Sequence, residues 1–109
     1  MDRPQSQSQA SPLVIRHTLE ISREPAHLAV RLEQLTLIRD GVTVASLPCA
    51  ELGMVVVDHP QVTYTHAALA QLAESQAVVV ICGRNHLPTA LLLPLADHTQ
   101  VVWRLSDQL

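Results

Sequence analysis

The sequence predicts a mainly β fold with one short helix: an α+β domain in which an antiparallel meander precedes a strand-helix-strand unit. The meander is indicated by Asp40-Gly41 between two β-rich runs. The second unit is indicated by an Ala- and Leu-rich stretch between two continuous apolar runs. Hydrophobic residues make up 48% of the 109 residues and aromatic residues 2%. We therefore expect a folded core built from Val, Leu, Ile and Ala.

Residues 13–47 are expected to form the meander. The run 13–21 predicts a first strand, and a turn at 22–26 contains Pro25. Leu28, Val30 and Leu32 alternate with more polar neighbours, which is the pattern of a half-buried strand. A tight turn near 33–34 and the Asp-Gly hairpin then lead into a return strand that carries Val42, Val44 and Leu47. All of these strands are expected to pair antiparallel and to share one apolar face.

The second unit begins at Met54–Val57, a continuous apolar run that predicts a strand covered on both faces. Residues 58–61 turn the chain, and Thr65 is suited to cap a helix over 66–75. Val78–Cys82 predicts a second buried strand, parallel to the first, because a crossover helix joins them. A loop over 83–88 and a last apolar strand over 90–95 complete the expected domain.

The organisation predicted from composition has three parts. Residues 1–12 are rich in Gln and Ser and predict a disordered polar tail, 13–98 form the β-rich domain, and 99–109 begin a linker. No apolar run is long enough to span a bilayer and no secretory signal is visible, so we expect a cytoplasmic protein without membrane contact. Cys49 and Cys82 are then expected to be reduced and buried, with a disulfide as the less favoured alternative.

The charge balance limits the nucleic-acid contacts that this chain can make. A formal net charge of −3 argues against a main DNA clamp, because phosphate binding depends on Lys and Arg. Any contact should therefore be local, and Arg23, Arg31 and Arg84 are the candidates. Arg84 lies in a loop after a buried strand, where functional residues tend to collect.

Catalytic patterns are missing from the sequence. The six histidines lack the close spacing of a zinc knuckle or a metalloprotease helix, although a small zinc site remains an alternative. There is no nucleophile turn of the hydrolase kind and no Gly-rich phosphate loop. Asp58 and Asp97 stand alone beside turns, so no carboxylate cluster is available to hold the metals of a nuclease. We assign no catalytic residue and no metal ligand.

The stretch from residue 55 to residue 100 resembles the N-terminal domain of the CRISPR-associated integrases of the Cas-one family, most like the type II members. The resemblance depends on an apolar strand, an Ala/Leu helix, a strand that ends in Cys, a His-x-Pro loop and a Leu-rich stretch before a His. The motif positions are Cys82, His86, Pro88, Leu92, Pro94 and His98. Two departures stand out: Gly83 replaces a usually acidic residue, and the loop 22–25 offers only Arg23 where the family can wedge a DNA end.

The resemblance implies a domain that dimerises and positions DNA during spacer acquisition. Members of the family act as homodimers bridged by the Cas-two protein, and they insert spacer DNA into the CRISPR array by Mg- or Mn-dependent transesterification. Their metal ligands lie in a C-terminal helical domain, which this sequence is expected to lack, as a truncated integrase would. Whether the chain is itself an enzyme stays open. The alternatives are a free-standing β-rich protein-interaction module and a small metalloenzyme that uses the histidines.

Overall fold

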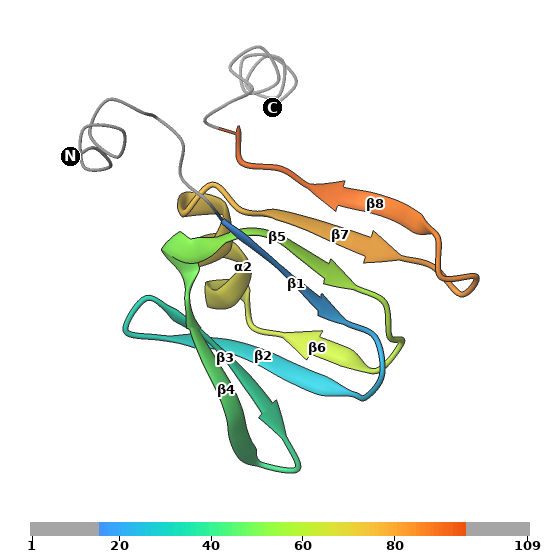
Figure 1. The fold of residues 1–109 in the computed structure, drawn as a ribbon, viewed down its shortest axis with the longest axis horizontal. Coiled ribbons are helices and arrows are strands. Elements are labelled where there is room, and N and C mark those ends of the chain that lie inside the picture. The colour runs from blue at the N-terminus through green and yellow to red at the C-terminus, as the bar shows by residue number, and fades with distance from the viewer. Residues whose placement is uncertain (1–15, 96–109) are drawn as a thin grey trace, which may run out of the picture.

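The computed structural model describes residues 16–95 as two four-stranded sheets that enclose one core, with a single α-helix beside them (Figure 1). The predicted tail 1–12 and linker 99–109 lie outside the described residues, and the predicted boundaries 13–98 extend beyond them at both ends. The elements are β1 (His17–Ile21), β2 (Ala26–Arg31), β3 (Gln34–Arg39), β4 (Val42–Pro48), η1 (Cys49–Glu51), β5 (Leu52–Val57), β6 (Val62–Tyr64), α2 (His66–Glu74), β7 (Val78–Cys82) and β8 (Pro88–Leu92). The predicted α+β class, mainly β with one short α-helix, is confirmed.

The first sheet has the strand order β1-β5-β7-β8. Its first three strands are parallel, and β8 runs antiparallel to β7. β5, α2 and β7 form the predicted crossover unit, with Val55 opposite Val79 in the register. The last strand covers Pro88–Leu92 instead of the predicted 90–95, because pairing with β7 already begins at Pro88.

The second sheet has the order β4-β3-β2-β6 and contains the meander in part. β2, β3 and β4 are antiparallel neighbours, as predicted. The prediction was wrong for the first strand, because β1 joins the other sheet in parallel with β5. The loop 22–25 carries the chain across the core from one sheet to the other, so Ile21 and Ala26 are both buried. β6 has three residues, too few for an alternating pattern, and it extends the sheet parallel to β2.

Two tight hairpin turns shape the second sheet. Asp40 and Gly41 have φ angles of 53° and 76°, which confirms the predicted turn. The preceding turn is formed by Leu32 and Glu33, with φ angles of 52° and 63°, one residue earlier than predicted. Both turns therefore use left-handed backbone at both central positions, and only Gly41 adopts that conformation without steric cost.

The helix begins as the sequence predicts and ends one residue earlier. The Thr65 hydroxyl accepts a hydrogen bond of 3.0 Å from the Ala68 amide and caps the first turn. Ala68 and Leu72 are fully buried on the inner side of α2. Gln76 follows in the left-handed region, with φ 68°, and turns the chain toward β7. No helix within residues 16–95 combines the length and the apolar character needed to cross a bilayer.

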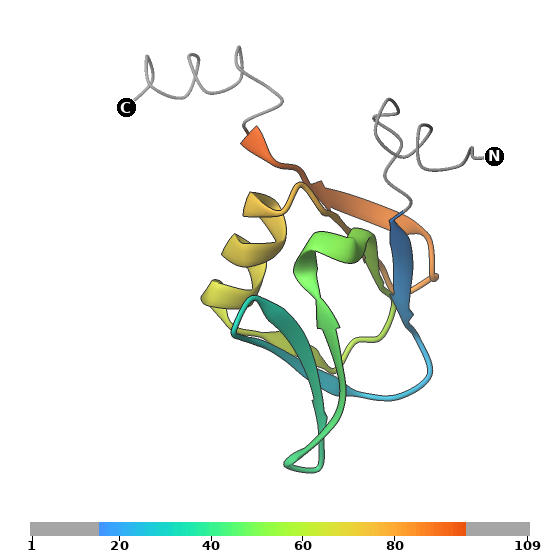
Figure 2. The ribbon, with the colours of Figure 1, turned by 60° about the vertical axis from the view of Figure 1, so that its left-hand side comes forward.

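One core lies between the sheets and is closed on one side by α2 (Figure 2). Its members are aliphatic or small, as the composition predicts: Ile21, Ala26, Leu28, Leu35, Leu37, Cys49, Leu52, Val55, Val57, Ala68, Leu72, Ala77 and Val79. The expected single apolar face of the return strand is wrong for Val42 and Val44, which are 61% and 50% exposed beside a β-bulge. The strand β5 is buried on one face only, since Met54 is 38% exposed.

Candidate nucleic-acid interface

The three parallel strands end at one edge of the first sheet. β1, β5 and β7 end at Ile21, Val57 and Cys82, so the loops 22–25, 58–61 and 83–87 lie along this edge in the order of the strands. The Asp58 amide donates a hydrogen bond of 2.8 Å to the Ile21 carbonyl and ties the central loop to β1. We call the three loops together the loop edge. Loops at the carboxyl ends of parallel strands are a common place for ligand contacts.

The central contact of the loop edge joins Asp58 to His86. The His86 Nδ1 lies 3.0 Å from Asp58 Oδ1, and because a carboxylate only accepts, the ring N–H donates. The Asp58 side chain is 16% exposed and that of His86 is 72% exposed. The backbone places the imidazole: His86 has φ 66°, and its amide donates to the Gly83 carbonyl at 3.0 Å. The sequence identified His86 as a motif position, whereas the partner Asp58 was expected to stand alone.

Gly83 has a steric reason to be glycine. A Cβ on this residue would lie 2.6 Å from Thr89 Oγ1, a distance that real Cβ atoms essentially never show. The close approach of β8 therefore leaves no room for the acidic side chain that the resembled family usually has at this position. Within the same loop, the Leu87 amide donates to Asn85 Oδ1 at 3.1 Å. The loop that carries Arg84 is thus closed by several short hydrogen bonds.

A cleft of about 380 Å³ opens between the central and last loops. The His59 Nδ1 accepts from the Gln61 amide at 3.1 Å, which fixes that ring at the rim. Asp58, His59, Pro60, Cys82, Gly83, Arg84 and His86 line the cleft. The cleft therefore combines one guanidinium and two imidazoles with one carboxylate.

The two cysteines both have a raised thiol pKa. Desolvation, together with the nearby carboxylates of Asp58 and Glu20, raises the pKa of the Cys82 thiol. Burial, and secondarily Glu33, raises the pKa of Cys49. Both thiols stay protonated at neutral pH, and both are free cysteines. Cys49 is buried as predicted, whereas Cys82 is only partly covered.

The residues present do not fit a metal ion. Among residues 16–95, no three His, Cys, Asp or Glu side chains lie close enough together to hold one. The pair Asp58 and His86 alone would leave most positions of an octahedral Mg²⁺ or Mn²⁺ shell without a protein ligand. No catalytic step can be derived from the described side chains through such an ion.

Two of the five described arginines donate hydrogen bonds to backbone carbonyls, and the other three make no such contact. Arg16 donates from Nη1 to the Ser75 carbonyl at 2.8 Å, at the C-terminal end of α2. Arg39 donates to the Pro25 carbonyl at 3.1 Å and lies 3.6 Å from Glu24. Arg23, Arg31 and Arg84 are exposed and make no hydrogen bond or ion pair with other described residues. Among residues 16–95, the three DNA-contact candidates named from the sequence are therefore the arginines without such a contact, and their role in DNA contact stays a prediction.

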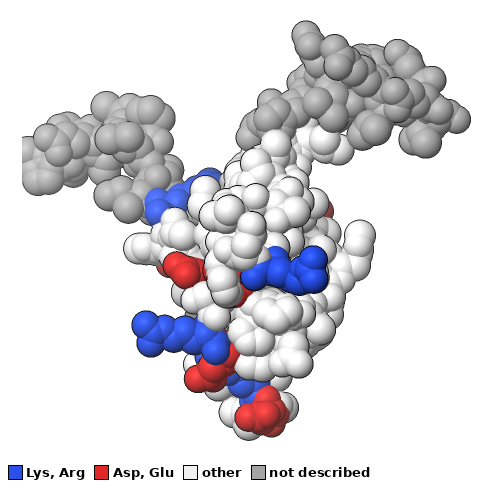
Figure 3. Space-filling model, turned by 90° about the vertical axis from the view of Figure 1, so that its right-hand side faces the viewer, with Lys and Arg blue, Asp and Glu red and all other residues white. Residues whose placement is uncertain are grey.

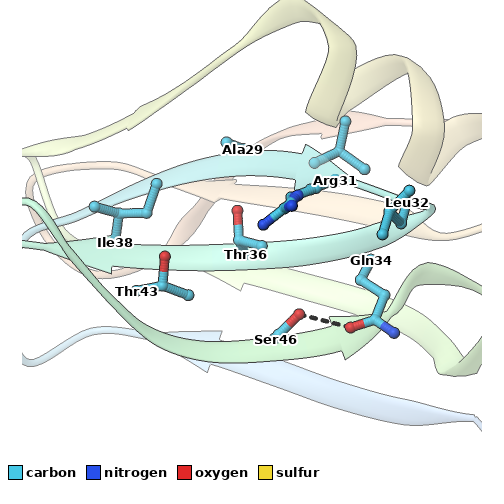
Figure 4. A pocket seen from close by; sticks show the side chains of 9 residues that line it. Ala29, Arg31, Leu32, Gln34, Thr36, Ile38, Thr43 and Ser46 are labelled. Atoms are coloured by element: carbon cyan, nitrogen blue, oxygen red, sulfur yellow. Dashed lines mark hydrogen bonds between the residues drawn. The ribbon is translucent and has the colours of Figure 1, made fainter.

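These three arginines do not form one site. Arg23 and Arg84 lie in the outer two loops of the loop edge, on either side of Asp58. In Figure 3, basic side chains on this face are separated by acidic and uncharged surface. Arg31 ends β2 at the opposite end of the second sheet. There it lines a shallow groove of about 570 Å³ together with Gln34, Thr36 and Ser46 (Figure 4).

The outer faces of the two sheets differ in chemistry. The outer face of the second sheet carries the polar residues of that groove, and Ser46 Oγ donates to Gln34 Oε1 at 2.6 Å. By strand register, the outer face of the first sheet carries the apolar side chains of Met54, Val56, Val78, Val80 and Leu91, with Thr18 and Glu20 of β1 at one side of it. Val80 is only 7% exposed, and Met54 and Leu91 are the exposed members. No helix or strand of residues 16–95 lies over that face (Figures 1 and 2). We call it the apolar face.

Two of the other motif positions bound β8. Pro88 begins this strand and Leu92 ends it. Pro94 is buried just beyond the strand. His98 lies outside the described residues.

Comparison with known proteins gives a match in structure alone. No protein-family model matches the sequence, and no curated protein sequence is significantly similar to it. A chain of a partial Cas6-RT-Cas1–Cas2 complex matches 72% of this chain with a TM-score of 0.66 and 17% identity. A chain of a complex of a Cas1 protein, TtCas1, with DNA matches 72% at a TM-score of 0.61 and 22% identity. A casposase bound to an integration product matches 71% at a TM-score of 0.58 and 13% identity.

The matches show that this chain shares its fold with a class of structures that includes Cas1 proteins and a casposase. Within that class, the described residues have the fold of the N-terminal β domain of Cas1, which confirms the resemblance at the level of structure. This chain spans 23%, 28% and 24% of the three matched chains. The closer likeness to type II members stays a prediction.

Proposed function

We propose that this chain dimerises and positions DNA in CRISPR spacer acquisition, as the N-terminal domain of a Cas1-type integrase. The observation that carries the proposal is the two-sheet fold, which recurs in a Cas1 complex with DNA and in a complex that contains Cas1 and Cas2. The proposed partners are a second copy of the chain, a Cas2 protein, and the spacer and array DNA. A free-standing interaction module is not favoured, because the matched structures are integrases or complexes that contain one.

The apolar face is the surface proposed for the homodimer. Parallel strands are usually covered on both faces, and here the described residues cover only one. Leu91, 58% exposed, and Met54, 38% exposed, would be removed from water by a partner. Apolar interfaces of this kind resemble a protein core and are typical of stable homodimers. The polar outer face of the second sheet is less suited to that role.

The loop edge is the surface proposed for DNA. Arg23 and Arg84 lie on either side of the central loop and have no described partner that would compete with a phosphate. Five arginines against seven carboxylates among residues 16–95 keep the contact local. Few neutralised phosphates predict a shallow dependence of affinity on salt, with a slope of about one to three.

We assign the metal-dependent chemistry of the resembled family to a helical domain separate from this β domain. The proposal therefore predicts no turnover by the purified chain. Labelled branched DNA incubated for hours with Mn²⁺ should stay intact. A metal-dependent product that disappears in a His86→Ala variant would overturn the assignment and favour the small metalloenzyme.

Light scattering coupled to size exclusion tests the dimer. The wild-type chain should be dimeric at micromolar concentration, and Leu91→Asp should shift it toward monomer because a charge would be buried in the interface. Val44→Asp is the matched control, since Val44 is 50% exposed on the edge strand of the other sheet and should not affect association. A wild-type monomer at every concentration, or dissociation by the control alone, would refute the apolar face as the interface.

Fluorescence anisotropy with a labelled duplex tests the DNA surface. The double substitution Arg23→Gln, Arg84→Gln should weaken binding several-fold and should reduce the salt slope by up to about two, one for each lost phosphate contact. Arg31→Gln makes a single such change at the other end of the domain and should have the smaller effect. If Arg31→Gln proves to be the more damaging change, the DNA surface lies on the second sheet instead.

A further inference from the structure

An apolar groove follows α2 on the side that faces the end of β8. It has a volume of about 550 Å³, within the range of clefts that hold a drug-sized ligand, about 300–1,000 Å³. Its lining contains a single polar side chain, that of His66. His66, Leu69, Ala70, Ala73, Leu92, Leu93 and Leu95 line the groove.

The groove is distinct from the apolar face. Leu91 points outward with Val80, whereas Leu92 lies opposite Val79, a residue of the core. Leu93 and Leu95 follow the strand, line the groove together with Leu92, and are 41% and 45% exposed. Exposed leucines gathered beside a helix of small residues mark a surface that another apolar segment should cover.

The chain itself supplies such a segment immediately downstream. The groove reaches Leu95, the last described residue, and 14 residues follow it. They contain the apolar cluster Val101, Val102, Trp103 and Leu105. Trp103 lies eight positions after Leu95, and eight steps of extended chain can span up to about 26–29 Å. The nine-residue helix α2 is only about 14 Å long.

Covalent connection favours this segment over a second copy as the occupant. A segment joined to the rim of its own groove has an effective concentration of about millimolar, far above that of a separate chain at micromolar concentration. Trp103 is also the only tryptophan in a chain with two aromatic residues. Aromatic rings bury more surface than other side chains, so this ring is the strongest available anchor.

We propose that the chain's own segment 101–105 binds in this groove, with Trp103 packed between α2 and the leucines after β8. The contact would anchor the chain as it leaves the β domain and would set the direction of whatever follows. This inference does not depend on the proposed role in spacer acquisition, because it concerns only the groove and the segment beside it.

The single tryptophan makes the proposal directly measurable on the full 109-residue chain. Trp103 fluorescence should be shifted to the blue of N-acetyltryptophanamide, and acrylamide should quench it several-fold less. Ala70→Arg places a charged side chain in the groove and should return both values toward those of the free amide. Ala67→Arg is the matched control, because Ala67 is exposed on the same helix outside the groove and should leave both values unchanged.

Circular dichroism identifies any variant that fails to fold, and Leu95→Gln then replaces Ala70→Arg, because Leu95 is 45% exposed and outside the core. A blue-shifted emission that is constant over a hundredfold dilution and lost in the groove variants supports the proposal. An emission like that of the free amide in the wild type would overturn it, as would a blue shift that survives every groove variant. A blue shift that disappears on dilution assigns the groove to the segment of a second copy and also overturns the proposal.

Discussion

Substitution of Gly83 by Ala should destabilise the domain through one identifiable contact. The added Cβ would lie 2.6 Å from Thr89 Oγ1, and this hydroxyl donates to the Leu87 carbonyl at 3.2 Å. The new methyl group therefore has to displace the start of β8 or break that hydrogen bond. Because the exposed Thr89 side chain can rotate away at the expense of that hydrogen bond, we expect a cost of about 1 kcal/mol. For a domain of this size each kcal/mol lowers Tm by about 4–8 °C.

A double-mutant cycle isolates the contact. Thr89→Ala removes the hydroxyl at a cost of about 1 kcal/mol or less, because the residue is exposed. With Oγ1 gone, the nearest atoms to the new methyl are Asn85 Oδ1 at 3.6 Å and Thr89 Cβ at 3.8 Å, which are ordinary contacts. The double variant should thus be about as stable as Thr89→Ala alone, with a coupling energy close to the whole cost of Gly83→Ala.

Urea unfolding at one fixed protein concentration measures all four members of the cycle, since dimerisation would otherwise change the apparent stability. The steric account fails if Gly83→Ala unfolds at the wild-type midpoint. It also fails if the loss persists in the presence of Thr89→Ala, because the cost would then arise from the backbone of Gly83 and not from the hydroxyl.

Three further predictions concern the helix cap, a turn and a thiol. Thr65→Ala should lower the free energy of unfolding by about 1 kcal/mol through loss of the N-cap bond, whereas Thr65→Ser should retain most of it in the same urea titration. Glu33→Gly should raise the free energy of unfolding by up to about 1 kcal/mol, because Glu33 has φ 63°; an unchanged or lower midpoint would contradict this. The raised pKa of Cys82 predicts that iodoacetamide modifies the native chain more slowly than free cysteine at pH 8, with a rate that rises through a midpoint above the ordinary thiol pKa. If the native chain and free cysteine react at equal rates at pH 8, Cys82 is not shielded. Cys49 is buried and should react only after unfolding.

The parts of the fold that the sequence predicted are those with strong local signals. The Asp40-Gly41 turn, the Thr65 cap and the strand Val78–Cys82 each depend on backbone conformation or hydrophobic periodicity within a few residues. The crossover between parallel strands was predictable because a helix connects two apolar runs. Arg23 and Arg84 were named from the sequence as candidates for DNA contact, and both side chains are exposed at the loop edge.

The parts that the sequence did not predict depend on long-range pairing. The sequence of β1 does not itself specify which sheet it joins, and the observed parallel register with β5 places Leu19 and Ile21 against the core. The contact between Asp58 and His86 joins residues 28 positions apart across two loops. No local pattern marks such a pair, because each residue alone is an ordinary polar member of a turn.

The outer face of the first sheet differs from what the sequence predicts. The apolar runs in β5 and β7 predict strands covered on both faces, yet only one face of each packs into the core. A solvent-facing side of a sheet tolerates polar residues, as Thr36, Thr43 and Ser46 on the other sheet illustrate. Apolar residues occupy the equivalent outward positions of the first sheet, above all Met54 and Val78, and no helix or strand of residues 16–95 covers them. The single-sided burial of these strands among residues 16–95 is a physical argument for the proposed partner on the apolar face, and it does not depend on likeness to other proteins.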